Sequence, residues 1–401
     1  MTVLPFAWRS LVRQPARTSL GVLGVAAVGA LLFDMLMLSD GLIVSMRDLL
    51  ERTGFDIRVT ASGDLRRAGD RMHDTSATLD AIRRLPQVST ALAIRFVEAE
   101  ADVHASTNPV PEGATGTIAL TLEGVQGDTR PWTVVTGRDP VGNQEVVVSQ
   151  ALADTAHVGL GADLVVRARC AARDQVLPPA RLQVVGIAEF PFELVGDPTA
   201  GGPMNVLDDA CAGPTDEADV ILASARDDVD ATAAAVRDAH PQLNVATNEQ
   251  VLGRLQRNGF TYFRQISAVL TVVTLAFALL LITVLLTVSV NQRLGEIAAL
   301  RALGFSRGRV VADVLCESVL IVGLGGLISL PLGAALARGL DSILKTMPGI
   351  PGQMYFFVLE PATLGQHGAL LTVTAVVAAL YPMQIVARLP IAATLRDEVL
   401  S

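Results

Sequence analysis

The 401-residue sequence contains little charge, few aromatic residues and a single lysine, Lys345. Charged residues make up 18% and aromatic residues 4%, whereas 51% of the residues are hydrophobic, which is more apolar than a typical soluble protein. The net charge of −9 does not fit the basic surface that binding to nucleic-acid phosphates requires. The composition therefore indicates a membrane protein with a sizeable water-exposed part and no nucleic-acid partner.

The sequence also lacks the motifs of nucleotide binding, metal binding and catalysis. It has no Gly-x-x-x-x-Gly-Lys-Ser/Thr phosphate loop, no His-Glu-x-x-His and no paired Cys-x-x-Cys. The stretch Gly304-Phe-Ser-Arg-Gly308 has Gly-x-Ser-x-Gly spacing, but it follows a charged helical segment, whereas a nucleophile elbow follows a strand. The five histidines lie singly along the chain. We therefore expect no catalytic residues, no metal site and no cofactor in this chain.

Four apolar runs are long enough to cross a membrane, because a spanning helix needs about 20 mostly apolar residues. We predict transmembrane helices at 19–44, 263–290, 310–338 and 366–386. The first run is longer than the apolar core of a signal peptide, which has about 7–15 residues, and no small-residue cleavage site follows it. We therefore interpret it as an uncleaved anchor and not as a cleaved signal peptide.

Arginines near the predicted spans set the expected orientation, because positive residues favour the cytoplasmic side. Three arginines precede the first span and four follow the second, which places both termini in the cytoplasm and the long segment after the first span outside. The remaining segments are a cytoplasmic leading segment at 1–18, an extracytoplasmic domain at 45–262, a cytoplasmic coupling segment at 291–309, an outer loop at 339–365 and a cytoplasmic tail at 387–401.

The segment between the first two spans is typical of a soluble, mixed α/β domain. Between Glu51 and Phe260 it carries 18 Arg against 30 Asp or Glu, a net charge of −12. Short valine-rich runs with alternating polarity predict strands, and helical patterns lie between them. In particular, Val220–Ala223, Val229–Ala239 and Leu243–Ala246 predict a strand-helix-strand unit.

Two of the three cysteines, Cys170 and Cys211, lie in this outer domain, and Cys316 lies at the start of the third span. An oxidising compartment allows Cys170 and Cys211 to form a disulfide. Sequence alone leaves open whether they bond or stay separate as buried thiols, because the geometry of the two side chains decides.

Small and acidic residues inside the spans are candidates for helix packing and function. Gly325, Ser329 and Gly333 recur every four residues in the third span, and such small residues let helices approach closely. Their partner is either a second subunit or another helix of this chain. Asp34 and Glu317 are acids within predicted spans, where an ionisable group is a functional candidate. Asp34 lies toward the outer end of its span, so contact with interfacial water is the alternative.

The coupling segment carries a resemblance to a known family. Asn291-Gln-Arg-Leu-Gly-Glu-Ile-Ala-Ala-Leu-Arg-Ala-Leu-Gly-Phe-Ser-Arg-Gly-Arg309 resembles the hallmark of FtsX-like permeases, and Glu317 matches their Glu at the head of the third span. The basic stretch Ala7–Arg17 and the closing stretch Arg388–Glu398 are similar to the ends of that family. Three outer stretches are similar to the MacB-type periplasmic core domain: Val135–Arg138, Glu145–Leu152 and Val184–Ile187.

This resemblance implies a fold and a location. The expected fold class is a membrane protein with four transmembrane α-helices and a mixed α/β extracytoplasmic MacB-like periplasmic core domain inserted between helices 1 and 2. The expected location is the bacterial inner (cytoplasmic) membrane, as a multi-pass protein. MacB carries a fused ATPase, and this sequence does not, so it resembles the separate permease subunits LolC/LolE and DevC.

The resemblance also implies a function, that of the permease subunit of an ABC transporter of the mechanotransmission type. A separate ABC ATPase, in two copies, would bind ATP and Mg, and its hydrolysis would move the outer domain to export or extract a lipoprotein, lipid, peptide or hydrophobic small molecule. Further implied partners are a second permease copy or a related permease, a periplasmic adaptor, lipoprotein or chaperone, and membrane lipid. The alternative is an FtsX-like, non-transport regulator of a cell-wall hydrolase, although FtsX-type outer domains are much smaller.

The residues expected to contact the ATPase lie in the coupling segment and follow from the resemblance. From charge alone, its arginines equally fit a role as topology anchors. The family pattern assigns the contact to five residues: Arg293, Glu296, Arg301, Gly304 and Arg307.

Overall fold

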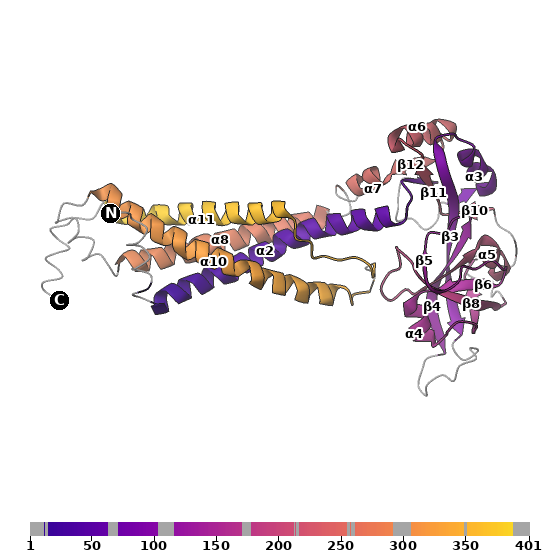
Figure 1. Ribbon diagram of the computed structural model, residues 1–401, viewed down its shortest axis with the longest axis horizontal. Helices are drawn as coiled ribbons and strands as arrows, with labels where there is room; N and C mark the ends of the chain where they lie inside the picture. Colours follow the sequence, from indigo (N-terminus) through magenta and orange to yellow (C-terminus); the bar gives the residue numbers. More distant parts are fainter. Residues whose placement is uncertain are drawn as a thin grey trace. The chain divides into compact units, whose positions relative to one another are not determined.

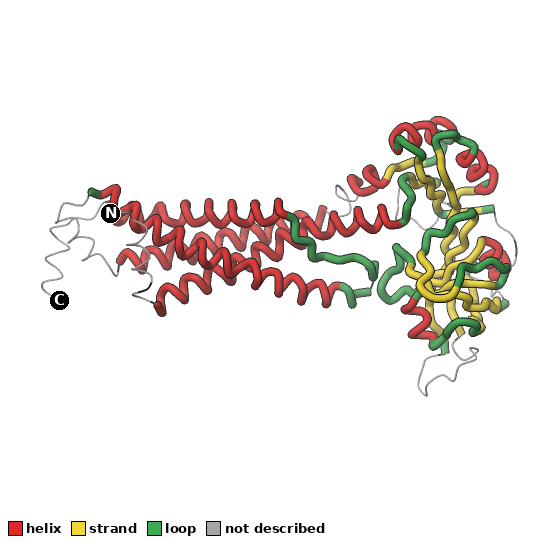
Figure 2. The backbone as a smooth tube through the Cα atoms, viewed as in Figure 1, coloured by secondary structure: helices red, strands yellow, loops and turns green. Residues whose placement is uncertain are grey.

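The chain divides into two compact units, one helical and one α/β (Figure 1). The helical unit comprises Met1–Val44, Gly259–Ile343 and Tyr355–Ser401, and the α/β unit comprises Ser45–Asn258 and Leu344–Met354. Figure 2 shows long helices in the first unit and all of the drawn strands in the second. The computed structural model describes Val12 and residues 15–62, 71–102, 116–170, 178–211, 213, 216–254, 257, 261–291, 306–348 and 351–387.

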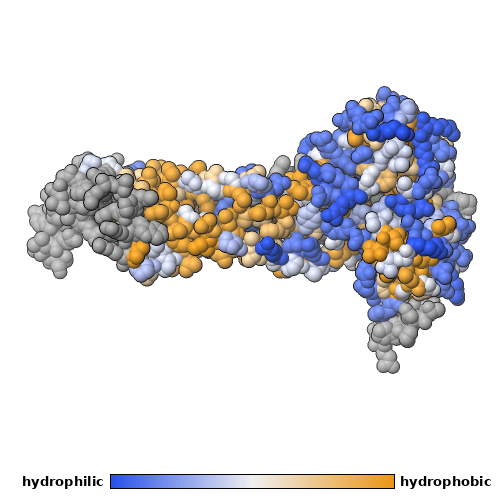
Figure 3. Space-filling model, in the orientation of Figure 1, coloured by the Kyte–Doolittle hydropathy of each residue, from blue (hydrophilic) through white to orange (hydrophobic). Residues whose placement is uncertain are grey.

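Four long helices build the described part of the helical unit, and each contains one candidate membrane span by length and composition. Every helix begins before and ends after the span predicted for it, because helical hydrogen bonding continues past the apolar stretch. Apolar side chains cover much of the helical surface in view (Figure 3). The helices are α2 (Pro15–Arg52), α8 (Thr261–Asn291), α10 (Arg307–Leu344) and α11 (Pro361–Ala387).

The four helices share an apolar core but leave much of their apolar surface uncovered. Val25 of α2, Ile282 of α8 and Ala378 of α11 are buried in this core. Phe277 and Leu280 of α8 are exposed. Apolar side chains all around a helix are expected for a segment whose remaining surface faces lipid.

One lobe of the α/β unit is a four-stranded antiparallel sheet covered by two helices. The strand order is β12-β1-β11-β3, and the helices α3 and α6 contribute apolar side chains to the lobe core. The predicted strand-helix-strand unit is confirmed as β11-α6-β12, with β1 lying between its two strands. The elements are β1 (Ile57–Thr60), α3 (Thr75–Arg83), β3 (Val88–Asp102), β11 (Val220–Ala225), α6 (Val229–Ala239) and β12 (Asn244–Thr247).

The long strand β3 continues into a second lobe, in which six strands close a ring. The pairing runs β3-β4-β9-β6-β8-β7 and returns to β3, with β4·β9 and β6·β8 parallel and the other pairs antiparallel. Closure protects the strand edges from pairing with other chains. The elements are β4 (Thr117–Gln126), β6 (Glu145–Val148), α4 (Gln150–Ala156), β7 (Asp163–Ala168), β8 (Ala180–Glu189), β9 (Thr199–Pro203) and α5 (Met204–Ala210).

The ring core combines strand residues with the two short helices. Val97 of β3, Leu122 of β4 and Leu164 of β7 are buried together with residues of α4 and α5. The described part of the unit also contains three smaller features. Strand β5 (Thr133–Gly137) pairs with β8, and β2 (Met72–His73) pairs with β10 (Glu217–Ala218) in a two-stranded ribbon. The third feature is the short helix α7 (Asn248–Arg254).

Candidate functional site

The small-residue face of α10 packs against α2 of the same chain. A Cβ atom at Gly325 would lie 2.7 Å from the Val25 Cβ, and one at Gly333 would lie 2.9 Å from a backbone carbonyl oxygen of α2. Between them, a Cβ at Gly29 of α2 would lie 2.9 Å from the Ser329 Cβ. The two helices therefore approach so closely that only small residues fit, and the structure places this face against a helix of the chain itself.

Ser329 also connects α10 to α11. Its Oγ lies 2.9 Å from Nε2 of His367, which is buried, and the His367 ring packs against the Phe33 ring of α2 with centroids 5.1 Å apart. These three side chains join α2, α10 and α11 in one buried contact. Sequence reasoning missed His367, because a single histidine beside an apolar run carries no spacing signal.

The two predicted intramembrane acids are both buried in the helical unit. Asp34 is 6% exposed and Glu317 is 5% exposed. The Oδ1 of Asp34 has no hydrogen-bond partner among the described residues. A buried acid in a spanning helix is costly, so Asp34 stays a candidate for function.

The residues predicted to contact an ATPase belong to the connection between α8 and α10. Arg293, Glu296, Arg301 and Gly304 lie outside the described residues, and Arg307 is the first residue of α10. Because α8 ends at Asn291, this connection joins the ends of two candidate spans. The roles of these five residues stay predictions.

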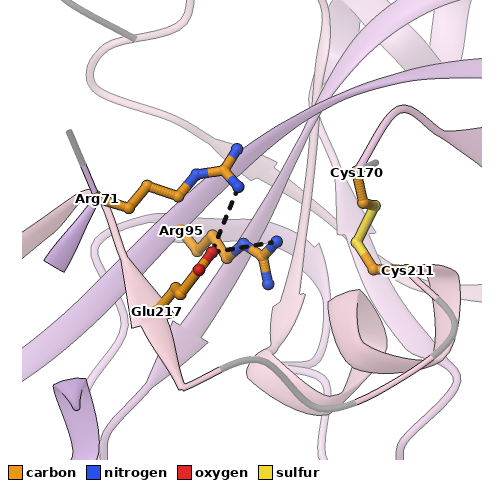
Figure 4. The surroundings of a disulfide bond; sticks show 5 residues. All are labelled: Arg71, Arg95, Cys170, Cys211 and Glu217. Atoms are coloured by element: carbon orange, nitrogen blue, oxygen red, sulfur yellow. Dashed lines mark hydrogen bonds and ion pairs between the residues drawn. A yellow bond between two sulfur atoms is a disulfide. The ribbon is translucent and has the colours of Figure 1, made fainter. Parts of the chain in front are cut away.

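Cys170 and Cys211 form a disulfide in the α/β unit, with their Cα atoms 5.4 Å apart (Figure 4). Cys170 follows β7, and Cys211 caps the C-terminal end of α5, so the bond ties α5 to the ring. The two cysteines are 41 residues apart, and closing a loop of that length in the unfolded chain stabilises the fold by about 4 kcal/mol. Cys316 in α10 is a free thiol.

Arg95 lies buried where the two lobes of the α/β unit meet. Its neighbours on the same side of β3 are Ala93, in the core of the four-stranded lobe, and Val97, in the ring core. Its Nη2 lies 4.0 Å from Oε2 of Glu217, which Arg71 also approaches to 3.4 Å (Figure 4). Burial lowers the pKa of Arg95, so the nearby carboxylate is needed to offset the cost of the buried charge. This ion pair connects β3 to β10 near the point where β3 passes between the lobes.

Glu123 of β4 is a buried carboxyl with no hydrogen bond or ion pair to another described residue. It lies opposite Phe96 of β3 and beside Gly201 of β9, and the rings of Trp132 and Phe190 pack on Gly201. Burial among these apolar groups raises the pKa of Glu123 to about 8. The carboxyl is therefore protonated over most of the acidic and neutral range.

Substituting Glu123 by Gln is expected to remove a pH dependence of stability. Because the folded-state pKa lies above the unfolded value, the stability tied to Glu123 is fully present below about pH 4.5 and falls by up to about 1.4 kcal/mol per pH unit as the pH rises to 8. The Gln variant should melt like the parent at pH 4 and at a higher temperature at pH 8.5. Thermal melting of the purified protein at both pH values measures this, with the exposed Glu98→Gln as control. Equal shifts for both variants would contradict the prediction.

Part of the chain matches the model of a known family, and two solved structures are similar to about half of the chain. Residues 268–391 match the family model of the FtsX-like permease C-terminal domain. No curated protein sequence matches the chain. The periplasmic region of MacB from Actinobacillus actinomycetemcomitans is similar to 52% of this chain over 98% of its own length, with 11% identity and a TM-score of 0.37. The extracellular domain of the noncanonic ABC-type transporter YknZ from Gram-positive bacteria is similar to 48% of this chain over 98% of its own length, with 16% identity and a TM-score of 0.33.

In the described part of the chain, four candidate membrane spans carry an α/β unit between the first and the second. The matched residues run from α8 to beyond the end of α11. This part of the chain is similar to the C-terminal domain of FtsX-like permeases.

Proposed function

We propose that the chain is the permease subunit of an ABC transporter of the mechanotransmission type. A separate ABC ATPase, present in two copies, binds ATP and Mg and contacts the coupling segment 291–309. The observation that carries this proposal is the family match over residues 268–391, which contains that segment. In this proposal the separate ATPase hydrolyses ATP, and the chain transmits the resulting movement.

The helix contacts support a route for that movement. The coupling segment leads into α10, and α10 packs directly against α2 at Gly325 and Gly333. Helix α2 continues without interruption to Arg52, and its residue Leu50 is buried with Ala246 and Val251 of the α/β unit. A close-packed interior transmits strain instead of absorbing it. A displacement of α10 is therefore passed to α2 and along α2 to the α/β unit.

The disulfide supports an orientation for the protein. Disulfides persist in oxidising compartments and are rare in the cytosol, so the Cys170–Cys211 bond favours an α/β unit on the outer side. Together with the arginines near the spans, it supports a multi-pass protein of the bacterial inner membrane with both termini in the cytoplasm. In this proposal a second permease copy, or a related permease, completes the transporter.

The molecule that the α/β unit binds distinguishes the transport proposal from the regulator alternative. The transport proposal expects the α/β unit to bind a lipoprotein, a lipid, a peptide, a hydrophobic small molecule or a periplasmic adaptor or chaperone. The regulator alternative expects it to bind a cell-wall hydrolase.

The experiment reconstitutes the full-length permease with its ATPase in lipid nanodiscs and adds fractionated extracytoplasmic proteins and lipids. Bound components are identified by mass spectrometry while ATP hydrolysis is followed. A retained lipoprotein, lipid, peptide or adaptor that raises the hydrolysis rate supports transport. A retained hydrolase whose activity rises with ATP, without any cargo that stimulates the ATPase, replaces transport by regulation.

A further inference from the structure

The connection between α10 and α11 is bound to the α/β unit through part of its length. The described residues of Leu344–Met354, here called the strap, belong to that unit. Pro351 of the strap forms an antiparallel bridge with Leu194, and the Gly352 N–H donates to the Glu193 carbonyl oxygen at 3.0 Å. The strap is therefore held by strand-like backbone pairing to the segment that links β8 to β9.

Glu193 extends this pairing into the ring of strands. Its Oε1 accepts a hydrogen bond from the Thr199 N–H at 3.1 Å, and the Ser149 hydroxyl bonds to its carboxylate as well. Ser149 caps the N-terminus of α4, and its N–H donates to the Thr199 carbonyl at 2.8 Å. Burial raises the pKa of Glu193, while the hydrogen bonds from Ser149 and Thr199 oppose that shift. Glu193 thus binds the strap with its backbone, and α4 and β9 with its side chain.

The residues that follow the strap are bound within the helical unit. The Phe356 N–H donates to Oδ1 of Asp341 at 2.9 Å, and the Arg338 guanidinium lies 5.0 Å from the centre of the Phe357 ring. The Phe356 carbonyl packs against Gly41 of α2 so closely that no Cβ fits there. The connection is therefore bound to the α/β unit at the strap and to the helical unit at the residues that follow it.

We infer that the strap is a second mechanical link between the α10–α11 pair and the ring of strands, with Glu193 as its positioning residue. The inference rests on the proposed function, because a link matters only if the spans move. Movement of α10 then reaches β9 and α4 through Glu193, independently of the route along α2. The nucleotide-driven response of the ring requires both routes.

The contact itself is tested by a cysteine pair. Leu194 and Pro351 lie opposite each other in the bridge, a position where Cβ atoms are about 4.5–5.5 Å apart, close to the range of disulfides. In full-length protein with Cys316→Ala, the pair Leu194→Cys and Pro351→Cys should lose all maleimide-reactive thiols on mild oxidation in native membranes. Each single substitution should keep its reactive thiol. A pair that stays reactive overturns the link, whatever the ATPase does.

The role of the contact is tested by removing the hydrogen bond between the strap and Glu193 together with the Glu193 side chain, which binds Thr199 of β9. Gly352 is the second residue of a turn closed by the bond from the Met354 N–H to the Pro351 carbonyl, a position that favours proline. Gly352→Pro therefore removes one donor and keeps the turn. It is combined with Glu193→Ala, and Glu193→Gln is the matched control, since its amide keeps an acceptor oxygen for Thr199.

The readout is the change in amide hydrogen exchange of residues 190–203 between the nucleotide-free and the vanadate-trapped complex. In the combined variant, this nucleotide-dependent change in hydrogen exchange should be at least about fivefold smaller than in the parent, while the ATPase stays bound. Glu193→Gln and the oxidised cysteine pair should keep it. A combined variant that responds like the parent overturns the strap and leaves the proposed function intact. If no ATPase is retained even by the parent, the proposed function fails and the strap loses its role with it.

Discussion

Leucine in place of Gly325 and Gly333 is expected to prevent the helical unit from packing. A Cβ at Gly333 would lie 2.9 Å from both the Ala30 carbonyl oxygen and the Phe33 ring, and a Cβ at Gly325 would lie 2.7 Å from Val25. Val25, Ala30 and Phe33 are all buried, so α2 and α10 must separate to make room. Overpacking costs about 1–3 kcal/mol at a single site, and the double variant combines two such sites on one interface. It should therefore aggregate in mild detergent or melt far below the parent.

A matched control lies on the same helix. At Gly323 of α10, no atom lies within 4 Å of the position that a Cβ would occupy, so Gly323→Leu adds the same side chain where space is open. Size-exclusion chromatography and thermal melting of the purified proteins compare the three. If the double variant is monodisperse and melts with the parent and Gly323→Leu, the close packing of α2 on α10 is refuted.

The helices of the membrane part could be predicted because their signal is local. About 20 apolar residues suffice to identify a span, and the four runs found in this way lie within α2, α8, α10 and α11. The ends were less predictable. Helix α2 runs to Arg52, eight residues beyond its predicted span, because the backbone bonds of a helix do not depend on the apolarity of its side chains.

Contacts between distant segments could not be predicted in the same way. Alternating polarity predicts that a strand exists, but it does not identify the partner, so the closure of the ring through β7 and β3 was not foreseen. His367 and Ser329 are 38 residues apart and neither belongs to a motif that names the other. The bridge between Leu194 and Pro351 joins two segments that are separated in the sequence by the helices α8 and α10. In each case the pairing follows from three-dimensional packing, which residue periodicity does not contain.

Co-purification of an ABC ATPase with this chain tests the central claim most directly. The claim is that residues 291–309 couple the permease to a separate ATPase, and Glu296 and Arg301 supply charge at this contact in the family pattern. Truncating one partner of a buried charged pair at an interface costs roughly 2–5 kcal/mol. The variant with Glu296→Ala and Arg301→Ala should therefore lose at least about 30-fold in ATPase affinity.

The measurement is affinity purification of the tagged full-length protein from gently solubilised native membranes, with quantification of the retained proteins by mass spectrometry. The control variant carries Arg84→Ala and Glu98→Ala, which remove the same two charges from exposed positions of the α/β unit. We predict an ABC ATPase with the parent and with this control, and its loss from Glu296→Ala with Arg301→Ala. A folded parent protein that retains no ATPase, or a coupling-segment variant that retains as much as the parent, would contradict the claim.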